Sequence, residues 1–150
     1  MNTDKLEQIF SMQAQLNDRV FAKQNLKTLD GAPLTTEFLF QAGSKETPIG
    51  PNTETNEWLK KFLWAMQDES RELKEELLEK WWSKDSLDMQ NIRVEIIDQL
   101  HFWISLALTS GMDASKVFEI YLQKNQVNLN RQEQGYSKAS KTEDDNRAIG

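Results

Sequence analysis

Hydrophobic side chains recur at intervals of three and four residues over four stretches of the chain. This spacing is the period of an amphipathic α-helix, and it predicts helices over about residues 4–24, 54–82, 87–110 and 114–133. The third stretch is apolar on nearly every face, so we expect it to lie inside the fold. No stretch shows the alternation of a β-strand. The pattern therefore predicts an all-α protein, a helical bundle of about four main helices.

Short polar residues and glycines mark the ends of these stretches. Between Leu26 and Thr53, glycine and proline interrupt the chain too often for a regular helix, which predicts a long loop after the first helix. Such a loop is either a functional segment or a plain connection. The candidate N-caps are Asn2 or Thr3, Asp85 or Ser86, and Asp113, and the candidate C-terminal stops are Gly111 and Gly135.

Length and composition indicate one domain. The chain has 150 residues, of which 38% are hydrophobic and 28% are charged, as in many single globular domains. We therefore expect residues 1–150 to form one domain, with the polar segment 136–150 as a flexible tail. No stretch approaches the roughly 20 apolar residues of a membrane span, and the first ten residues lack a signal-peptide pattern. A cytoplasmic protein without a membrane partner is expected.

Charge and composition restrict the ligands. The net charge of −6 at pH 7 argues against a nucleic-acid polymer as partner, because phosphate contacts need a basic face. The chain has no cysteine and one histidine, which excludes thiolate sites and argues against a histidine-rich zinc site. A metal would have oxygen ligands, which favour Mg²⁺, Mn²⁺ or Ca²⁺. A small nucleotide fits this charge if cations screen its phosphates.

Two acidic pairs interrupt the apolar faces of the second and third helices. Glu69 continues an apolar stripe and Glu72 flanks it one turn further on, while Glu95 and Asp98 are set among apolar residues. Members of each pair share a face, so both pairs are expected to point inward. Ionised carboxylates in such a place are very costly without compensating charge, which divalent cations supply. The alternative is that they are solvated helix-face charges, like the neighbouring Glu75, Glu76 and Glu79.

Polar side chains also interrupt the first and fourth helices. Gln13 and Asn17 lie on the apolar face of the first helix, where a side-chain amide could match the donor and acceptors of uracil or could bond to another helix. On the fourth helix, Lys124 and Arg131 are two turns apart and could hold phosphate oxygens, or they could belong to a solvated face. His101 follows Asp98 by three residues and is expected to support the site or the core rather than to bind metal.

Four segments together resemble a known family. They are MQAQLND from Met12, Glu69 with Glu72, IRVEIIDQLHF from Ile92 to Phe102, and KNQVNLNRQEQGY from Lys124 to Tyr136. This set resembles the dimeric, all-α dUTPase family, which is related to the MazG-type nucleotide pyrophosphohydrolases. The last segment is the most specific, and the resemblance covers most of the chain.

The resemblance implies a function and a set of residues. It implies hydrolysis of dUTP to dUMP and pyrophosphate with Mg²⁺ as cofactor, which Mn²⁺ could replace on oxygen ligands. The third helix, apolar all round, offers more apolar surface than one small bundle buries, so a homodimer is expected, with a dimer of dimers as the alternative. Glu72 would help a metal-bound water attack phosphorus. The implied metal ligands are Glu69, Glu72, Glu95 and Asp98. The implied phosphate ligands are Lys124, Asn128, Arg131 and Lys141, and the implied base or sugar contacts are Gln13, Asn17, Asn125 and Tyr136.

The C-terminal tail and the turn before the KN motif both differ from those of other family members. Tyr136, Lys138, Lys141 and Asn146 match a tail that closes over the nucleotide in relatives, although this tail is shorter. Some members carry an extra helical insert before the KN motif, where this chain has only the short GMDA turn. Selectivity for dUTP over other pyrimidine nucleotides therefore does not follow from the resemblance.

Three other functions compete with this hypothesis. A broader MazG-like nucleoside triphosphate pyrophosphohydrolase would share the metal site, and Gln13 and Asn17 argue against it. A di-iron four-helix bundle normally takes two Glu-x-x-His pairs and fails on ligand count, since the chain has one histidine. A non-catalytic interaction module would explain the apolar stripes but not the inward carboxylates.

Overall fold

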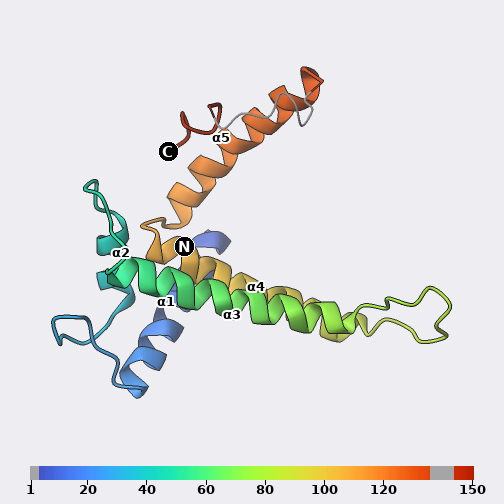
Figure 1. Cartoon of the computed structure of the whole chain (residues 1–150), viewed down its shortest axis with the longest axis horizontal. Coiled ribbons are helices and arrows are strands. Elements are labelled where there is room, and N and C mark those ends of the chain that lie inside the picture. The colour runs from blue at the N-terminus through green and yellow to red at the C-terminus, as the bar shows by residue number, and fades with distance from the viewer. Residues whose placement is uncertain (1–3, 136–143) are drawn as a thin grey trace. The chain divides into compact units, whose positions relative to one another are not determined.

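In a computed structural model, residues 4–135 and 144–150 are described, and their regular structure is helical apart from one bridge between Lys27 and Pro33 (Figure 1). The helices are α1 (Lys5–Lys23), α2 (Thr36–Gly43), α3 (Glu54–Glu76), α4 (Met89–Thr109) and α5 (Ala114–Glu133). The all-α prediction is confirmed. The chain forms two compact units, Met1–Met112 and Asp113–Gly150.

Two of the predicted N-caps are wrong. Asp4, not Asn2 or Thr3, caps α1, because its carboxylate accepts hydrogen bonds from the backbone N–H groups of Leu6, at 2.8 Å, and Glu7, at 3.1 Å. At the start of α4 the cap is Asp88, whose carboxylate accepts from the N–H of Asn91 at 3.1 Å. Neither Asp85 nor Ser86 serves there, and the carboxylate of Asp85 instead accepts a hydrogen bond from the Ser83 hydroxyl at 2.9 Å.

The remaining end signals are confirmed. Asp113 caps α5 by accepting from the N–H of Lys116 at 2.8 Å. Gly111 and Gly135 follow the ends of α4 and α5 with φ of +81° and +65°, which a side chain would disfavour.

The loop predicted between Leu26 and Thr53 contains α2, so the prediction of an uninterrupted loop is wrong. Thr35 caps this short helix by accepting from the N–H of Phe38 at 3.0 Å. Leu39 is only 1% exposed and anchors α2 in the core. Eight residues would not hold a helix alone, so packing sustains it.

The second predicted helix ends early. α3 stops at Glu76, and Leu77 adopts an extended conformation, although the apolar pattern continues to Trp82. Beyond this point the apolar side chains lack a packing surface in unit 1, since Trp81 is 89% exposed and Trp82 is 64% exposed. A helix without tertiary contacts is marginal, which explains the early end.

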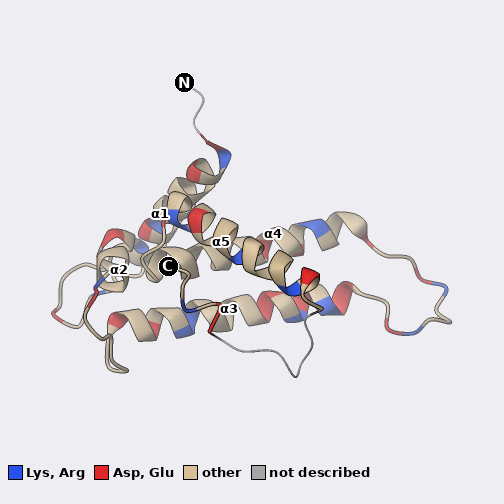
Figure 2. Ribbon diagram, turned by 90° about the horizontal axis from the view of Figure 1, so that it is seen from above, with Lys and Arg blue, Asp and Glu red and all other residues tan. Residues whose placement is uncertain are grey.

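α4 packs against α1, α2 and α3, as its apolar sequence predicted. Its C-terminal half is buried, including Ile104, Ala107 and Leu108. Its N-terminal half runs beside α3 and beyond α1 and α2 (Figure 1). There Ile96 and Ile97 are exposed, so the prediction of an interior helix holds for only half its length. Figure 2 shows charged residues spread along α3, whereas α4 is mostly uncharged.

The core of unit 1 joins all four helices and the α1–α2 connection. Aromatic rings from α1 and α3 meet there, with Phe21 and Trp58 centroids 5.1 Å apart and Trp58 and Phe62 centroids 5.5 Å apart. The buried members are Phe21, Leu34, Leu39 and Phe62, with Leu26, Trp58, Phe102 and Leu106 packed against them. Among the helices that the structure describes, none has the length and hydropathy that a membrane crossing requires.

Candidate functional site

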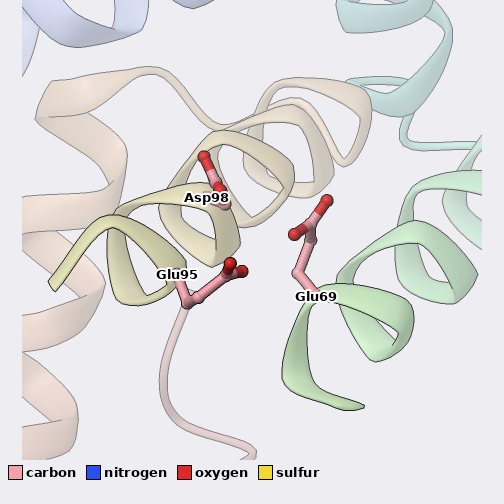
Figure 3. A group of neighbouring side chains, drawn as sticks. All are labelled: Glu69, Glu95 and Asp98. Carbon is pink, nitrogen blue, oxygen red and sulfur yellow. The ribbon is translucent and has the colours of Figure 1, made fainter. Parts of the chain in front are cut away.

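Three carboxylates from two helices meet between α3 and α4. Oxygens of Glu69, Glu95 and Asp98 all lie within 4.8 Å of one another, and each of these residues is half-buried. Figure 3 shows Glu69 and Glu95 pointing toward one another from the two helices. Glu95 and Asp98 share a face because they are three residues apart in α4. The structure therefore brings together three of the four predicted metal ligands.

The electrostatics of this acidic cluster are unfavourable without a cation. Burial raises the pKa of Glu69 above the ordinary carboxyl value, and the negative charges of Glu72 and Asp98 raise it further. The pKa of Glu95 is raised by burial first and then by the same two charges. Oε2 of Glu95 is buried and has no hydrogen-bond partner among the described residues. A buried carboxylate oxygen without a hydrogen-bond partner is well suited to coordinate a cation.

Glu72 and Glu76 lie at the edge of the acidic cluster. The Glu72 side chain is exposed rather than pointing inward, yet its charge raises the pKa of both Glu69 and Glu95. Glu76 is half-buried and also raises the pKa of Glu95, so it belongs near the cluster rather than among the solvated charges. Glu76 lies one turn after Glu72 in the sequence, and this spacing could have predicted that it lies near the acidic cluster.

A cavity of about 580 Å³ connects the acidic cluster with the amides of α1. Two carboxylates of the cluster, Glu69 and Asp98, line it together with Gln13 and Asn17. Aromatic side chains form part of the remaining wall. They are Phe21, Trp58, Phe62 and Phe102. A ligand in this space would meet carboxylates at one place, amides at another and apolar rings between.

Gln13 and Asn17 belong to a hydrogen-bonded network with α4. Nε2 of Gln13 donates to Oδ1 of Asn17 at 2.9 Å, and Nδ2 of Asn17 donates to the hydroxyl of Ser105 at 3.0 Å. Oε1 of Gln13 faces Nδ1 of His101, and the Ser105 hydroxyl donates to the backbone carbonyl of His101 at 2.9 Å. The sequence suggested a base contact or an inter-helix bond for the two amides, and the inter-helix bond is present.

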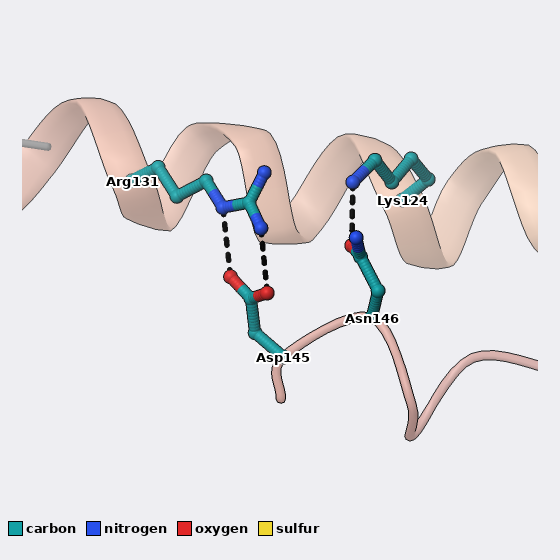
Figure 4. Close-up of polar contacts among 4 residues, drawn as sticks. All are labelled: Lys124, Arg131, Asp145 and Asn146. Atoms are coloured by element: carbon teal, nitrogen blue, oxygen red, sulfur yellow. Dashed lines mark hydrogen bonds and ion pairs between the residues drawn. The ribbon is translucent and has the colours of Figure 1, made fainter. Parts of the chain in front are cut away.

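The predicted phosphate ligands lie in the second unit. There, Nε and Nη2 of Arg131 donate to the two carboxylate oxygens of Asp145, at 2.7 and 2.5 Å, and Nζ of Lys124 donates to Oδ1 of Asn146 (Figure 4). The hydrogen bond from Arg131 lowers the pKa of Asp145. Asn125 and Asn128 are exposed on α5.

Tyr136, Lys138 and Lys141 lie outside the described residues. Within the second unit, the α5 residues Lys124 and Arg131 thus contact Asn146 and Asp145.

The first unit thus defines an all-α protein in which three carboxylates adjoin an amide-lined cavity. The chain belongs to the dUTPase family, whose sequence model matches residues 5–117. This match covers α1 to α4 and ends before Lys124, so the KN motif lies outside it.

Two curated relatives are phage proteins, each named dCTP pyrophosphatase. The protein of Enterobacteria phage LZ5 is 41% identical over 49 residues, and that of Enterobacteria phage T4 is 37% identical over 49 residues. Each match covers 33% of this chain, but only 28% of the first relative and 29% of the second. The chain thus spans less than a third of the length of these relatives. No solved structure matches the chain.

Proposed function

We propose that this protein hydrolyses dUTP to dUMP and pyrophosphate with the aid of Mg²⁺. The observation that carries the proposal is one cavity lined by two carboxylates of the acidic cluster and by the amides of Gln13 and Asn17. A nucleotide uses both features, because its phosphates need cations and its base needs hydrogen-bonding groups. Membership of the dUTPase family and the names of the phage relatives support a nucleotide pyrophosphatase.

The donor set fits Mg²⁺. Hard divalent cations prefer carboxylate oxygens, and Glu95 offers a buried oxygen without a partner in the described part of the chain. We propose Glu69, Glu72, Glu95 and Asp98 as ligands, with Mn²⁺ able to replace Mg²⁺ on the same oxygens. Bound Mg²⁺ would neutralise the carboxylates and polarise phosphoryl oxygens. Glu72, exposed at the edge of the cluster, would accept the proton of the attacking water.

The remaining contacts divide between base and phosphates. Gln13 and Asn17 are proposed to read the edge of the pyrimidine, since both line the cavity beside its aromatic wall. In the second unit, cationic and amide groups of α5 and the segment after it are proposed to hold the phosphates and sugar. Those proposed for the phosphates are Lys124, Asn128, Arg131 and Lys141, and those proposed for the base or sugar are Asn125 and Tyr136.

A second candidate substrate is dCTP, or a wider set of pyrimidine nucleoside triphosphates. The names of the two phage relatives favour dCTP, whereas the description of the family favours dUTP. An amide side chain can pair with either base, because it offers one donor group and one acceptor group. The metal chemistry would be the same for both substrates.

We also propose that the partner is a second copy of this chain, with a dimer of dimers as the alternative. Apolar side chains of α1 and α4 line a cavity of about 340 Å³ in which Met12 is 65% exposed and Ile97 is 52% exposed. Contiguous apolar surface of this kind is usually buried against another protein molecule. Light scattering should give the mass of a dimer for the wild type, and Ile97→Lys should shift the mass toward the monomer. A monomeric wild type would refute the proposal.

A substrate panel tests the activity. Purified protein with Mg²⁺ is given dUTP, dCTP, dTTP, dUDP and UTP, and released pyrophosphate is measured separately from phosphate. We expect dUTP to be hydrolysed fastest, with pyrophosphate as product. Faster hydrolysis of dCTP would favour the second candidate, and preference for a purine nucleotide would refute pyrimidine recognition.

Matched variants test the acidic cluster. Asp98→Asn and Glu72→Gln should each lower kcat by at least about a hundredfold, because they remove a ligand and a general base. Glu75→Gln is the control, since Glu75 lies on α3 but is exposed and pairs with Arg71 at 2.9 Å. Circular dichroism should be the same for all three variants. Near-normal activity of Asp98→Asn would show that the site is elsewhere.

A further inference from the structure

The hydrogen bonds between α1 and α4 have a fixed direction. A backbone carbonyl can only accept, and the carbonyl of His101 receives the proton of the Ser105 hydroxyl at 2.9 Å. With its proton committed there, the Ser105 oxygen can only accept from its other neighbour. Nδ2 of Asn17, at 3.0 Å, is therefore the donor, and Oδ1 of Asn17 must point the other way.

The same direction continues to the ring of His101. Oδ1 of Asn17 accepts from Nε2 of Gln13 at 2.9 Å, which turns Oε1 of Gln13 toward Nδ1 of His101. That nitrogen must then carry a proton and donate it. The Ser105 end of the network thus imposes one orientation on the two amides, and the Nδ1–H tautomer of His101 completes it.

Burial strengthens this constraint. Gln13 is 6% exposed and Ser105 is 1% exposed, so solvent is poorly placed to replace a lost hydrogen bond. An inverted Asn17 would present its oxygen to the Ser105 oxygen, and the hydroxyl would have to abandon the carbonyl of His101. Inversion would therefore lose one hydrogen bond inside the fold, so it is disfavoured.

The orientation of an amide distinguishes uracil from cytosine. At positions 4 and 3, uracil presents an acceptor and then a donor, whereas cytosine presents a donor and then an acceptor. An amide that pairs with this edge must therefore face opposite ways for the two bases held in one position. Asn17 lines the large cavity and keeps one Nδ2 proton and one Oδ1 lone pair beyond the network. An amide held in one orientation would bind one of the two bases, and an amide free to turn would bind both.

We propose that Ser105 and His101 are positioning residues that determine pyrimidine selectivity by fixing the orientation of Asn17. Ser105 holds Asn17 directly, and His101 holds it through Gln13. This inference rests on the proposed function, but it holds for either preferred base. It also gives the second amide of α1 a role, since Gln13 links the orientation of Asn17 to His101.

The test is the ratio of kcat/KM for dUTP to kcat/KM for dCTP, measured on each variant. Ser105→Ala removes the acceptor that holds Asn17. The preference for one nucleotide over the other should therefore fall by about tenfold or more, which brings the ratio closer to one. The matched control is Thr109→Val, which removes a buried hydroxyl one turn along α4 that donates to the Ser105 carbonyl at 2.7 Å. Its ratio should equal that of the wild type. A loss of folded protein cancels in this ratio, so a merely structural effect would not change it.

A second variant reverses the network. Gln13→Glu offers only acceptors, so Asn17 must donate to it and turn its oxygen toward Ser105, and the preference should move to the other base. An unchanged ratio in active Ser105→Ala or Gln13→Glu protein would overturn the inference while leaving the proposed function intact. A wild type that hydrolyses neither nucleotide would overturn both.

Discussion

Replacing Gly43 with alanine should destabilise the fold, because the ends of α2 and α4 meet backbone to backbone at this residue. A Cβ at Gly43 would lie 2.1 Å from the carbonyl oxygen of Thr109 and 3.0 Å from the backbone nitrogen of Gly111, whereas ordinary contact begins near 3.4 Å. Backbone atoms cannot move aside by changing rotamer, so the helices must separate. Overpacking of this kind costs about 1–3 kcal/mol, and we expect about 2 kcal/mol after a small gain in helix propensity.

Thermal melting followed by circular dichroism, together with urea unfolding, would measure this cost. A loss of about 2 kcal/mol should lower Tm by about 8 °C for a unit of this size and lower the urea midpoint. Gly50→Ala is the control, because nothing lies within 4 Å of its Cβ position and its φ is outside the left-handed region. Its stability should stay within about 0.5 kcal/mol of the wild type. Equal Tm values for the two variants would refute the close approach of α2 and α4.

Three further predictions concern charge and core packing. The raised carboxyl pKa values mean that Glu69 and Glu95 bind protons more tightly in the folded state, so they reduce stability as the pH rises above the ordinary carboxyl value. Glu95→Gln should therefore raise Tm at neutral pH without metal and abolish stabilisation by Mg²⁺, which is about 2.7 kcal/mol when Mg²⁺ is about 100 times its Kd. Asp145→Asn should lower KM for the triphosphate by up to about fivefold, because it removes the negative charge that competes for the Arg131 guanidinium in a partly exposed ion pair. Because the pKa of Asp145 is lowered, the ion pair is fully formed when the pH is above the ordinary carboxyl pKa, and it is lost as the pH falls through the lowered pKa. In acid, the KM values of wild type and variant should therefore converge. Leu39→Ala should cost about 2–5 kcal/mol in urea unfolding, since this side chain is only 1% exposed.

The acidic cluster shows how far helical periodicity can locate a site. The spacing of Glu95 and Asp98 in an apolar helix predicted that they share a face, and the structure places them together with Glu69. The same reasoning was wrong about the exposure of Glu72 and about Glu76, which it assigned to solvent. Both errors have one cause, since helix phase alone does not specify which neighbour covers each face. The position of α4 beside α3 decides that.

The glycines show a second limit. Gly43 was interpreted as one of several helix-breaking residues in a loop, but it ends α2 and permits the contact with the end of α4. A glycine needed for close approach has the same local pattern as a glycine in a turn. Only the partner backbone distinguishes the two.

The amides of α1 show the same division between sequence and structure. The sequence placed Gln13 and Asn17 on one apolar face and left open whether they bind a base or another helix. The structure supplies Ser105 and His101 from α4, 88 residues further along the chain, and with them the direction of every hydrogen bond in the network.

The sequence by itself determined the all-helical class, the approximate extent of the main helices and the two acidic helices, because these features depend on contacts within one or two turns. Only the tertiary structure decided where α3 stops, that α2 exists, which carboxylates meet, and which way the amides face. Each of these depends on groups far apart along the chain, and periodicity within a helix carries no information about such partners.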